Sequence, residues 1–406
     1  AANRYKMGDF KPYLYRTKDY GRSWKLITDG IDEEHFTRVV RADPKREGLL
    51  YAGTETGMYV SFDDGKAWQP FQLNLPIVPI TDLAIRDDHL VAATQGRSLW
   101  MIDDLTPLHQ LRDELLEKPF HLFAPKAAYR MEGGYNAKTK GAGINHPNGL
   151  MVYFHLPAFS EKDTISLTFR EESGDTIRHF STRASDKKDL LKVDTGSNLF
   201  IWNTRYPGAE RFEGMVLWWA SMAGPKAVPG NYEVHLSVNG DAQSQDFRIL
   251  KDPRTEVSPQ QIREQFNFLM DIREQVSRAH RAIKQIRDIR GQIENYTSRL
   301  PDEERYQPLR EAADEIDSVI TTVEEELYQT KNRSPQDPLN YPIRLTNKLA
   351  HLTSLMSKSD FPPTDQAVAV KEELSRAIDR NLEVLDKVVE EKLPAFNRLV
   401  REIGVD

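Results

Sequence analysis

Hydrophobic and polar positions follow two different patterns along the chain, and the change between them falls near residue 255. Before that point, short runs alternate apolar and polar positions between clusters of Gly, Asn, Asp and Pro, as β-strands joined by turns do. From Ser258 onward, apolar residues recur at spacings of three and four, which is typical of amphipathic helices. The pattern therefore predicts a multidomain chain, with a β-rich part followed by a helical part.

An internal repeat extends through residues 10–105. The aspartates of two well-preserved copies, Asp19 and Asp63, lie 44 residues apart, and Asp103 of a degraded third copy follows 40 residues later. A period of about 40–45 residues with short strands is typical of the four-stranded blades of a β-propeller. A closed ring has about four to eight blades. We therefore expect residues 1–105 to be the last two to three blades of a propeller, with the other blades in an N-terminal part of the same protein.

Each well-preserved copy carries the pattern Ser/Thr-x-Asp-x-Gly-x-x-Trp at the turn between two strands. The Asp side chain is expected to accept hydrogen bonds from N–H groups of the turn, and the Gly to supply a positive φ. The Trp begins the next strand and is expected to pack over the turn. The aspartates are thus interpreted as turn residues, not as the paired carboxylates of a glycosidase. The same structural role is predicted for all eight pattern residues: Thr17, Asp19, Gly21, Trp24, Ser61, Asp63, Gly65 and Trp68.

The middle of the chain is predicted to hold a linker and a second β domain. Residues 106–147 are the linker, with a short helix over 105–117 and a short strand over 120–123. Residues 148–254 carry strand signals at the spacing of a fibronectin- or immunoglobulin-like β-sandwich. The Asn-Gly pair at 239–240 is expected to form a hairpin turn in this domain.

Two features of this middle part have alternative interpretations. Gly141 and Gly143 are read as part of a surface loop and not as a phosphate cradle, because no strand leads into them and no helix follows. Trp202, Trp218 and Trp219 are read as core or interface residues. A sugar-stacking platform formed by the adjacent pair is the alternative.

Residues 255–406 are predicted to form an antiparallel bundle of four helices. Ser258 suits the N-cap of the first helix, with a Pro after it and Gln261 at the capping-box position. The fourth helix is expected to begin at Thr364 and to bend at Pro394. The first helix is rich in Arg and Lys and the second in Asp and Glu, which favours an antiparallel pair with solvated faces over a docking surface for another protein.

Composition excludes several classes of partner and site. The 406 residues carry a formal net charge of -7, which argues against nucleic acid as a partner, and no apolar run is long enough to span a membrane. Cysteine is absent, so disulfides, thiolate metal sites and a cysteine nucleophile are excluded. No metal-binding or cofactor-binding motif is present, and neither a metal nor a cofactor is expected. Arg38, Arg41 and Arg97 are candidate contacts for an anionic ligand, with structural hydrogen bonding as the alternative.

The sequence resembles the C-terminal portion of bacterial sortilin-like proteins, exported Asp-box or BNR-repeat β-propellers of a glycosyl-hydrolase-like family. This resemblance implies export to the periplasm, the cell surface or the medium, and a preceding N-terminal propeller part as partner. Unlike animal sortilin receptors, the chain has no cysteine-rich module, and no motif identifies the arginine triad and Tyr/Glu pair of a sialidase. The matching segments are 9–13, 36–41, 48–55, 60–65, 73–76, 96–105, 200–207, 229–232 and 252–254, followed by the helical tail.

The motifs favour binding over catalysis. The leading prediction is an exported, non-catalytic propeller protein that binds a protein, peptide or glycan. One version of this hypothesis places the protein in a cell-envelope assembly. The alternative is a sialidase-like glycoside hydrolase whose active site lies at the propeller centre, mostly in the N-terminal blades.

Overall fold

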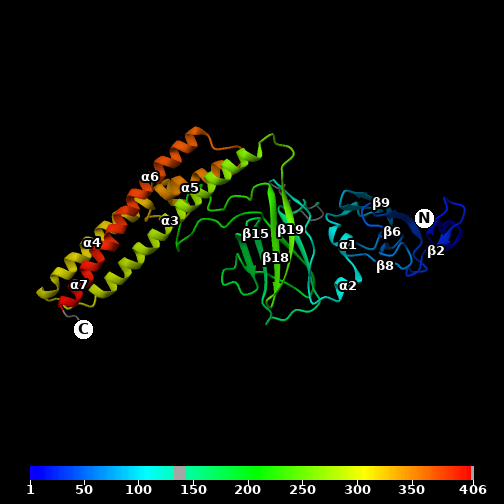
Figure 1. The fold of residues 1–406 in the computed structure, drawn as a ribbon, viewed down its shortest axis with the longest axis horizontal. Helices are drawn as coiled ribbons and strands as arrows, with labels where there is room; N and C mark the ends of the chain where they lie inside the picture. The colour runs from blue at the N-terminus through cyan, green and yellow to red at the C-terminus, as the bar shows by residue number, and fades with distance from the viewer. Residues whose placement is uncertain (132–142, 144, 404–406) are drawn as a thin grey trace.

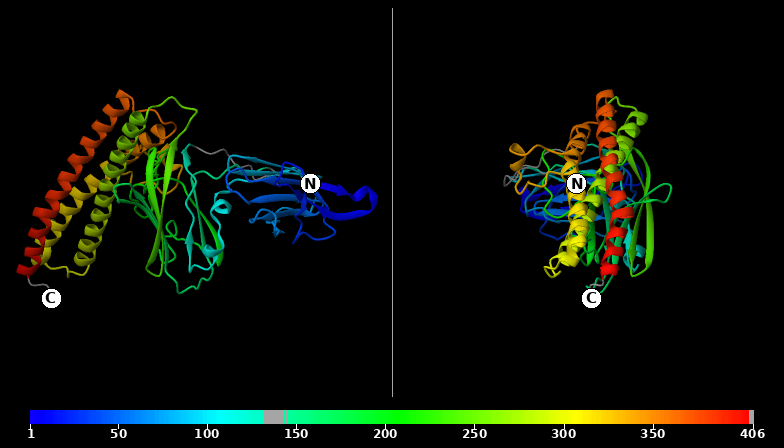
Figure 2. Two further views of the ribbon diagram at one scale, coloured as in Figure 1. Left: turned by 45° about the vertical axis from the view of Figure 1, so that its right-hand side comes forward. Right: turned by 90° about the vertical axis from the view of Figure 1, so that its left-hand side faces the viewer.

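The chain forms several separate sheets followed by a helical region, arranged along one long axis (Figure 1). The structure, a computed structural model, describes residues 1–131, 143 and 145–403. The repeats lie at one end and the helices at the other, and two larger sheets lie between them, as the left view of Figure 2 also shows. The mixed β and helical organisation predicted from the periodicity is confirmed.

The N-terminal strands pair with neighbours in sequence and form small antiparallel sheets. The pairs β1-β2 and β3-β4 come first, the four-stranded meander β5-β6-β7-β8 follows, and β9-β10-β11 forms a sheet of three strands. The bounds are β1 Ala2–Arg4, β2 Asp9–Tyr13, β3 Tyr15–Arg16, β4 Lys25–Leu26, β5 Thr37–Ala42, β6 Leu50–Thr54, β7 Gly57–Ser61, β8 Gln69–Pro70, β9 Ile80–Arg86, β10 His89–Thr94 and β11 Leu99–Ile102.

In the third copy of the repeat, the turn after the second strand of the hairpin comes one residue later than the 40-residue spacing from Asp63 predicts. Leu50 pairs with Ser61 in the second copy, whereas Leu90 pairs with Ile102 in the third, because the hairpin between β10 and β11 is one residue longer. Asp104, and not Asp103, therefore takes the place of the turn aspartate. Asp104 is buried and accepts a hydrogen bond from the backbone N of Thr106 at 2.9 Å.

Two sheets in the middle of the chain bury their inner faces in one hydrophobic core. Their orders are β12-β14-β17 and β13-β19-β18-β15-β16. Trp202 of the first sheet stacks on Phe169 of the second with ring centroids 4.5 Å apart, so this Trp is a core residue. The Asn239-Gly240 turn is confirmed, with φ of 52° and 102°. The bounds are β12 His121–Leu122, β13 Ala128–Arg130, β14 Leu150–Leu156, β15 Ile165–Glu171, β16 Thr176–Ser181, β17 Gly196–Trp202, β18 Gly230–Val238 and β19 Asp241–Lys251.

The segment predicted as a linker is partly built into these sheets. Its predicted single helix is wrong, because the backbone is extended at Arg112 and separates α1 (Thr106–Gln110) from α2 (Asp113–Leu116). Its strand β12 pairs with β14, and β13 pairs in parallel with β19. Gly141, from the disfavoured phosphate cradle, lies outside the described residues.

The helices of the C-terminal region pack around one apolar core. The capping box is confirmed: Ser258 Oγ accepts from the backbone N of Gln261 at 3.2 Å, and the Gln261 side chain accepts from the backbone N of Ser258 at 2.9 Å. Thr364 caps α6 through the backbone N of Ala367. The bounds are α3 Pro259–Thr297, α4 Gln307–Leu327, α5 Leu345–Met356, α6 Asp365–Lys387 and α7 Leu393–Ile403.

The irregularity expected at Pro394 takes the form of a π-helical turn. Residues Val388–Lys392 join α6 to α7 with the wider π spacing, and Pro394 occupies the second position of α7. Proline has no N–H to donate to the carbonyl of Glu390, and a local π turn is one way to accommodate the missing α-helical bond.

The loop between β17 and β18 joins the core of the sheets to that of the helices. Phe212 from this loop belongs to the helical core, while Ile262 and Phe266 of α3 belong to the core of the sheets. The Asn347 side chain of α5 accepts from the backbone N of Trp218 at 2.6 Å and donates to its carbonyl at 2.8 Å. The sheets and helices are therefore fixed to each other by packed contacts.

His280 of α3 is completely buried where that loop crosses the helix. Its Nδ1 lies 2.6 Å from the carbonyl oxygen of Glu210, and since a carbonyl only accepts, the ring nitrogen must donate. The ring packs edge-on against Phe212. Burial lowers the pKa of His280 below its ordinary value of 6.5, so the folded protein holds the ring neutral.

We expect the stability of the helical region to fall as the pH drops below about 6.5. The unfolded chain then binds a proton that the folded chain excludes at His280. The stabilisation is therefore complete above the unfolded pKa and is lost below it. The loss from this group is at most about 1.4 kcal/mol per pH unit. Urea unfolding followed by helical circular dichroism at several pH values measures the slope. His280→Gln is expected to reduce it, and equal slopes for both proteins would contradict the assignment.

Candidate functional site

The two turns of the repeat are built alike from side-chain and backbone hydrogen bonds. Ser61 Oγ accepts from the backbone N of Gly65 at 2.9 Å, and Asp63 Oδ1 accepts from the backbone N of Lys66 and of Ala67, both at 3.0 Å. In the first copy, Thr17, Asp19 and Ser23 make the corresponding bonds to the turn. Gly21 and Gly65 have φ of 90° and 78°, the left-handed conformation expected of them.

These bonds also fix the charge of the two aspartates. Hydrogen bonds from the side chain and backbone of Ser23 and from Thr17 lower the pKa of Asp19 to about 2. Burial acts to raise the pKa of Asp63, but hydrogen bonds from the turn outweigh it and lower the pKa. A catalytic acid of a glycosidase needs a raised pKa. Asp19 and Asp63 are therefore unsuited to that role.

Trp68 joins the second copy of the repeat to the first. Its side chain is 5% exposed, and the indole Nε1 donates to the carbonyl oxygen of Ile27 at 2.8 Å. Its backbone N donates to the carbonyl oxygen of Asp29 at 2.8 Å. Gly30 makes this approach possible, because a Cβ there would lie 2.2 Å from the Trp68 carbonyl oxygen. Nothing in the local sequence pattern identified Ile27 or Gly30, since both act on a residue about 40 positions away.

The first copy exposes the face that the second copy buries. Trp24, the equivalent of Trp68, is 61% exposed, and its indole donates only to Gly21 of its own turn, at 3.1 Å. Tyr15 is 44% exposed, whereas its equivalent Tyr59 is 6% exposed. We call this surface the Trp24 face. It is formed by Tyr15 and Trp24, and Tyr20 and Leu26 are further large exposed hydrophobic residues of the first copy.

The three candidate arginines lie apart and have different contacts. Arg41 of β5 donates from Nη2 to Asp82 of β9 at 2.6 Å and so joins two sheets of the repeats. Arg38 donates from Nε to Glu55 at 2.6 Å within one sheet. Arg97 is exposed and donates to the carbonyl oxygen of Gly96, its neighbour in sequence. Arg41 and Arg38 thus have carboxylate partners, and the structure does not bring the three arginines together.

Two further observations concern possible chemistry. Within residues 1–131, 143 and 145–403, no group of three or more His, Asp or Glu side chains has the geometry to hold a metal ion. In the same residues, no helix has both the length and the apolar character needed to span a bilayer. Of the Trp pair considered as a sugar platform, Trp218 is half-buried and Trp219 is 73% exposed, with rings tilted by 41°.

Comparisons with known proteins give no family assignment. No protein-family model matches the chain, and no curated protein matches it. The extracellular domain of a putative hybrid two-component system from B. thetaiotaomicron aligns with 59% of this chain and 29% of its own, at 12% identity and a TM-score of 0.19. A structure described as pT26-6p aligns with 88% of this chain and 68% of its own, at 10% identity and a TM-score of 0.14. The chain covers less than a third of the first structure, and neither similarity is close enough to indicate a shared fold.

Proposed function

We propose that the protein is an exported, non-catalytic binding protein whose repeats belong to an Asp-box β-propeller that binds a protein, peptide or glycan. The fibronectin- or immunoglobulin-like sandwich and the helical bundle serve as its scaffold. The observation that carries this proposal is the contrast between Trp24, which is 61% exposed, and its buried equivalent Trp68.

This contrast supports the proposal that a further sheet covers the Trp24 face. The first copy of the repeat buries Tyr59 and Trp68 of the second copy through Ile27 and the residues beside it. An equivalent surface is required to bury Tyr15 and Trp24 in the same way, because side chains of this size rarely remain exposed together unless they form an interface. The proposed occupant is another sheet of the same repeat from the same polypeptide, and sheets added in this way would generate a ring.

The inner strands of such a ring would present ligand contacts. Arg41 and Asp82 stand on β5 and β9, and their side chains remain 45% and 61% exposed although they form an ion pair. A half-exposed pair of this kind can exchange partners with a charged ligand at little cost, because surface ion pairs contribute only about 0–1 kcal/mol. Arg38 and Arg97 are the other proposed contacts.

The first experiment tests the propeller. Hydroxyl-radical footprinting of the protein purified from its native cells measures the oxidation rate of each tryptophan. Trp68 is the buried reference and Trp219 the exposed one within the same molecule. We expect Trp24 to be oxidised at a rate close to that of Trp68. A rate close to that of Trp219 would show the Trp24 face to be open and would refute the closed ring.

The second experiment tests binding against catalysis. The native protein and its Arg41→Ala variant are applied to peptide and glycan arrays, and the bound ligands are then incubated with the protein and examined for cleavage. We expect the bound ligands to remain intact. We also expect the Arg41→Ala variant to bind them with an affinity that is lower by about tenfold or more, because a hydrogen bond to a charged group contributes about 1.5–3 kcal/mol. Cleavage of a bound glycan would instead support the glycoside hydrolase.

A further inference from the structure

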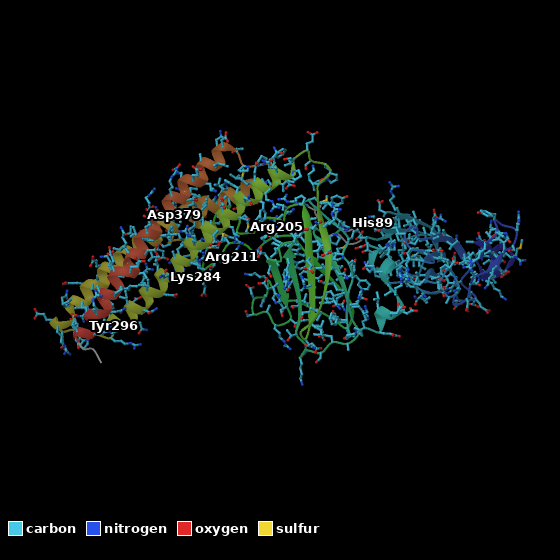
Figure 3. The ribbon with its side chains drawn as sticks, in the orientation of Figure 1. His89, Arg205, Arg211, Lys284, Tyr296 and Asp379 are labelled. Carbon is cyan, nitrogen blue, oxygen red and sulfur yellow. The ribbon has the colours of Figure 1, made fainter. Side chains whose placement is uncertain are left out.

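A large cleft lies where the five-stranded sheet meets the helical region. It has a volume of about 960 Å³ and is lined by β16, by the loop between β17 and β18, and by Lys284 of α3. Figure 3 shows Arg205, Arg211 and Lys284 along this junction. The cleft is remote from the repeats and has no part in the proposed propeller (Figure 1).

The cleft carries more positive than negative charge, although the whole chain carries -7. Each of its three carboxylates already has a cationic partner, Asp186 with Lys188, Asp189 with Arg178, and Glu210 with Lys284. Arg211 is a further cation in the lining. Arg211 is exposed, and in the described part of the chain it forms no ion pair. The surplus charge favours an anionic ligand.

One wall of the cleft is preformed. The two segments of the loop are held together by hydrogen bonds from Tyr206 N to Pro225 O and from Ala209 N to Met222 O, both 3.0 Å. The segments are so close that a Cβ at Gly224 would lie 2.0 Å from the carbonyl oxygen of Tyr206. A wall that is already ordered reduces the entropy lost when a ligand binds.

Another part of the lining is an open strand edge. β16 is the last strand of the five-stranded sheet and pairs with β15 on its inner side. On its outer side, Ser181 bridges to Leu190, but residues 176–179 have no second strand among the described residues, and all four line the cleft. Alternate backbone N–H and C=O groups of such an edge are available to an added strand. Arg178 lies on this edge and Arg211 lines the same cleft, and their guanidinium groups disfavour basic strands and favour acidic ones.

From the open edge and the surplus charge together, we infer that this cleft binds an extended acidic peptide, which pairs with β16 as an additional strand and places its carboxylates near Arg178 and Arg211. An acidic glycan would satisfy the arginines but would leave the strand edge without backbone partners. The peptide accounts for both features, and for this reason it is preferred.

The experiment measures binding of a fluorescein-labelled peptide of alternating Glu and Thr to the full chain by fluorescence anisotropy. We expect saturable binding that Arg211→Glu weakens by at least about tenfold, because the variant places like charges together. Arg86→Glu is the matched control: Arg86 is 89% exposed on β9, and its carboxylate contact is a 3.9 Å approach to Asp87. The control makes the same change in net charge and is expected to retain the wild-type affinity.

Two further ligands separate strand pairing from simple charge attraction. The same peptide is synthesised with every second backbone nitrogen methylated, in each of the two possible registers, and polygalacturonate serves as an acidic glycan. One methylated register should bind at least about tenfold more weakly, since the charges are kept and the donors are lost. Any one of four results would overturn the inference. The first two are equal binding of both methylated registers and no binding of the unmodified peptide. The other two are an equal loss of affinity in the two Arg→Glu variants and Arg211-dependent binding of polygalacturonate alone. None of these results bears on the Trp24 face, so the inference and the proposed propeller can fail independently.

Discussion

Replacing Glu324 with alanine is expected to lower the free energy of unfolding of the helical region by about 3–5 kcal/mol. The Glu324 side chain is only 4% exposed between α3 and α4. Its two oxygens accept from Arg287 Nε and Arg290 Nη1, both at 2.7 Å. Removal of the carboxylate leaves two partly buried guanidinium groups with an unmatched charge. Arg290 retains Asp317, at 2.8 Å, so Arg287 bears most of the loss.

Urea unfolding followed at a helical circular dichroism wavelength measures this change. Glu325→Ala is the matched control, because the neighbouring Glu325 is exposed on the same helix. The control is expected to alter the unfolding free energy by less than about 0.5 kcal/mol. A similar small change for both variants would mean that the Glu324 network contributes no more than surface ion pairs do.

The sequence predicted the helices well because their signals are local. Ser258 and Gln261 lie three residues apart in the first turn of one helix, so the capping box could be recognised from spacing alone. The complementary charge of the first two helices was also visible in the sequence. The burial of Glu324 in particular was not visible, because the three consecutive glutamates near the end of α4 look alike in the sequence and only the packing of α3 buries one of them.

The remaining errors come from contacts between distant residues and from small changes of register. One additional residue in the hairpin before β11 moved the turn aspartate from Asp103 to Asp104, and a degraded copy offers no Gly or Trp to reveal the shift. The long loop after β17 carries no periodic pattern, although Phe212 anchors it in the helical core. The cleft beside this loop could not be predicted for the same reason.

Replacing Trp68 with alanine is expected to lower the free energy of unfolding of the repeats by about 3–5 kcal/mol, the cost typical of removing a large buried aromatic side chain. The indole fills the space between the first two copies and donates to Ile27. Hydrogen exchange of residues 50–61, followed by mass spectrometry, reports the local stability of β6 and β7 without requiring that the whole chain unfold at once. Trp68→Phe keeps the ring packing and is expected to cost about 1–3 kcal/mol for the carbonyl left without its donor.

The equivalent Trp24→Ala variant connects this prediction to the proposed ring. If a further sheet covers the Trp24 face, Trp24 in the native protein has the surroundings of Trp68, and its removal should cost a comparable amount, about 3–5 kcal/mol. If the face is open, the substitution removes a side chain that is 61% exposed and should cost less than about 1 kcal/mol. Hydrogen exchange of residues 9–16 in the native protein distinguishes the two cases. A large effect at Trp68 together with a negligible one at Trp24 would agree with the packing of the first two copies against each other and would exclude the ring.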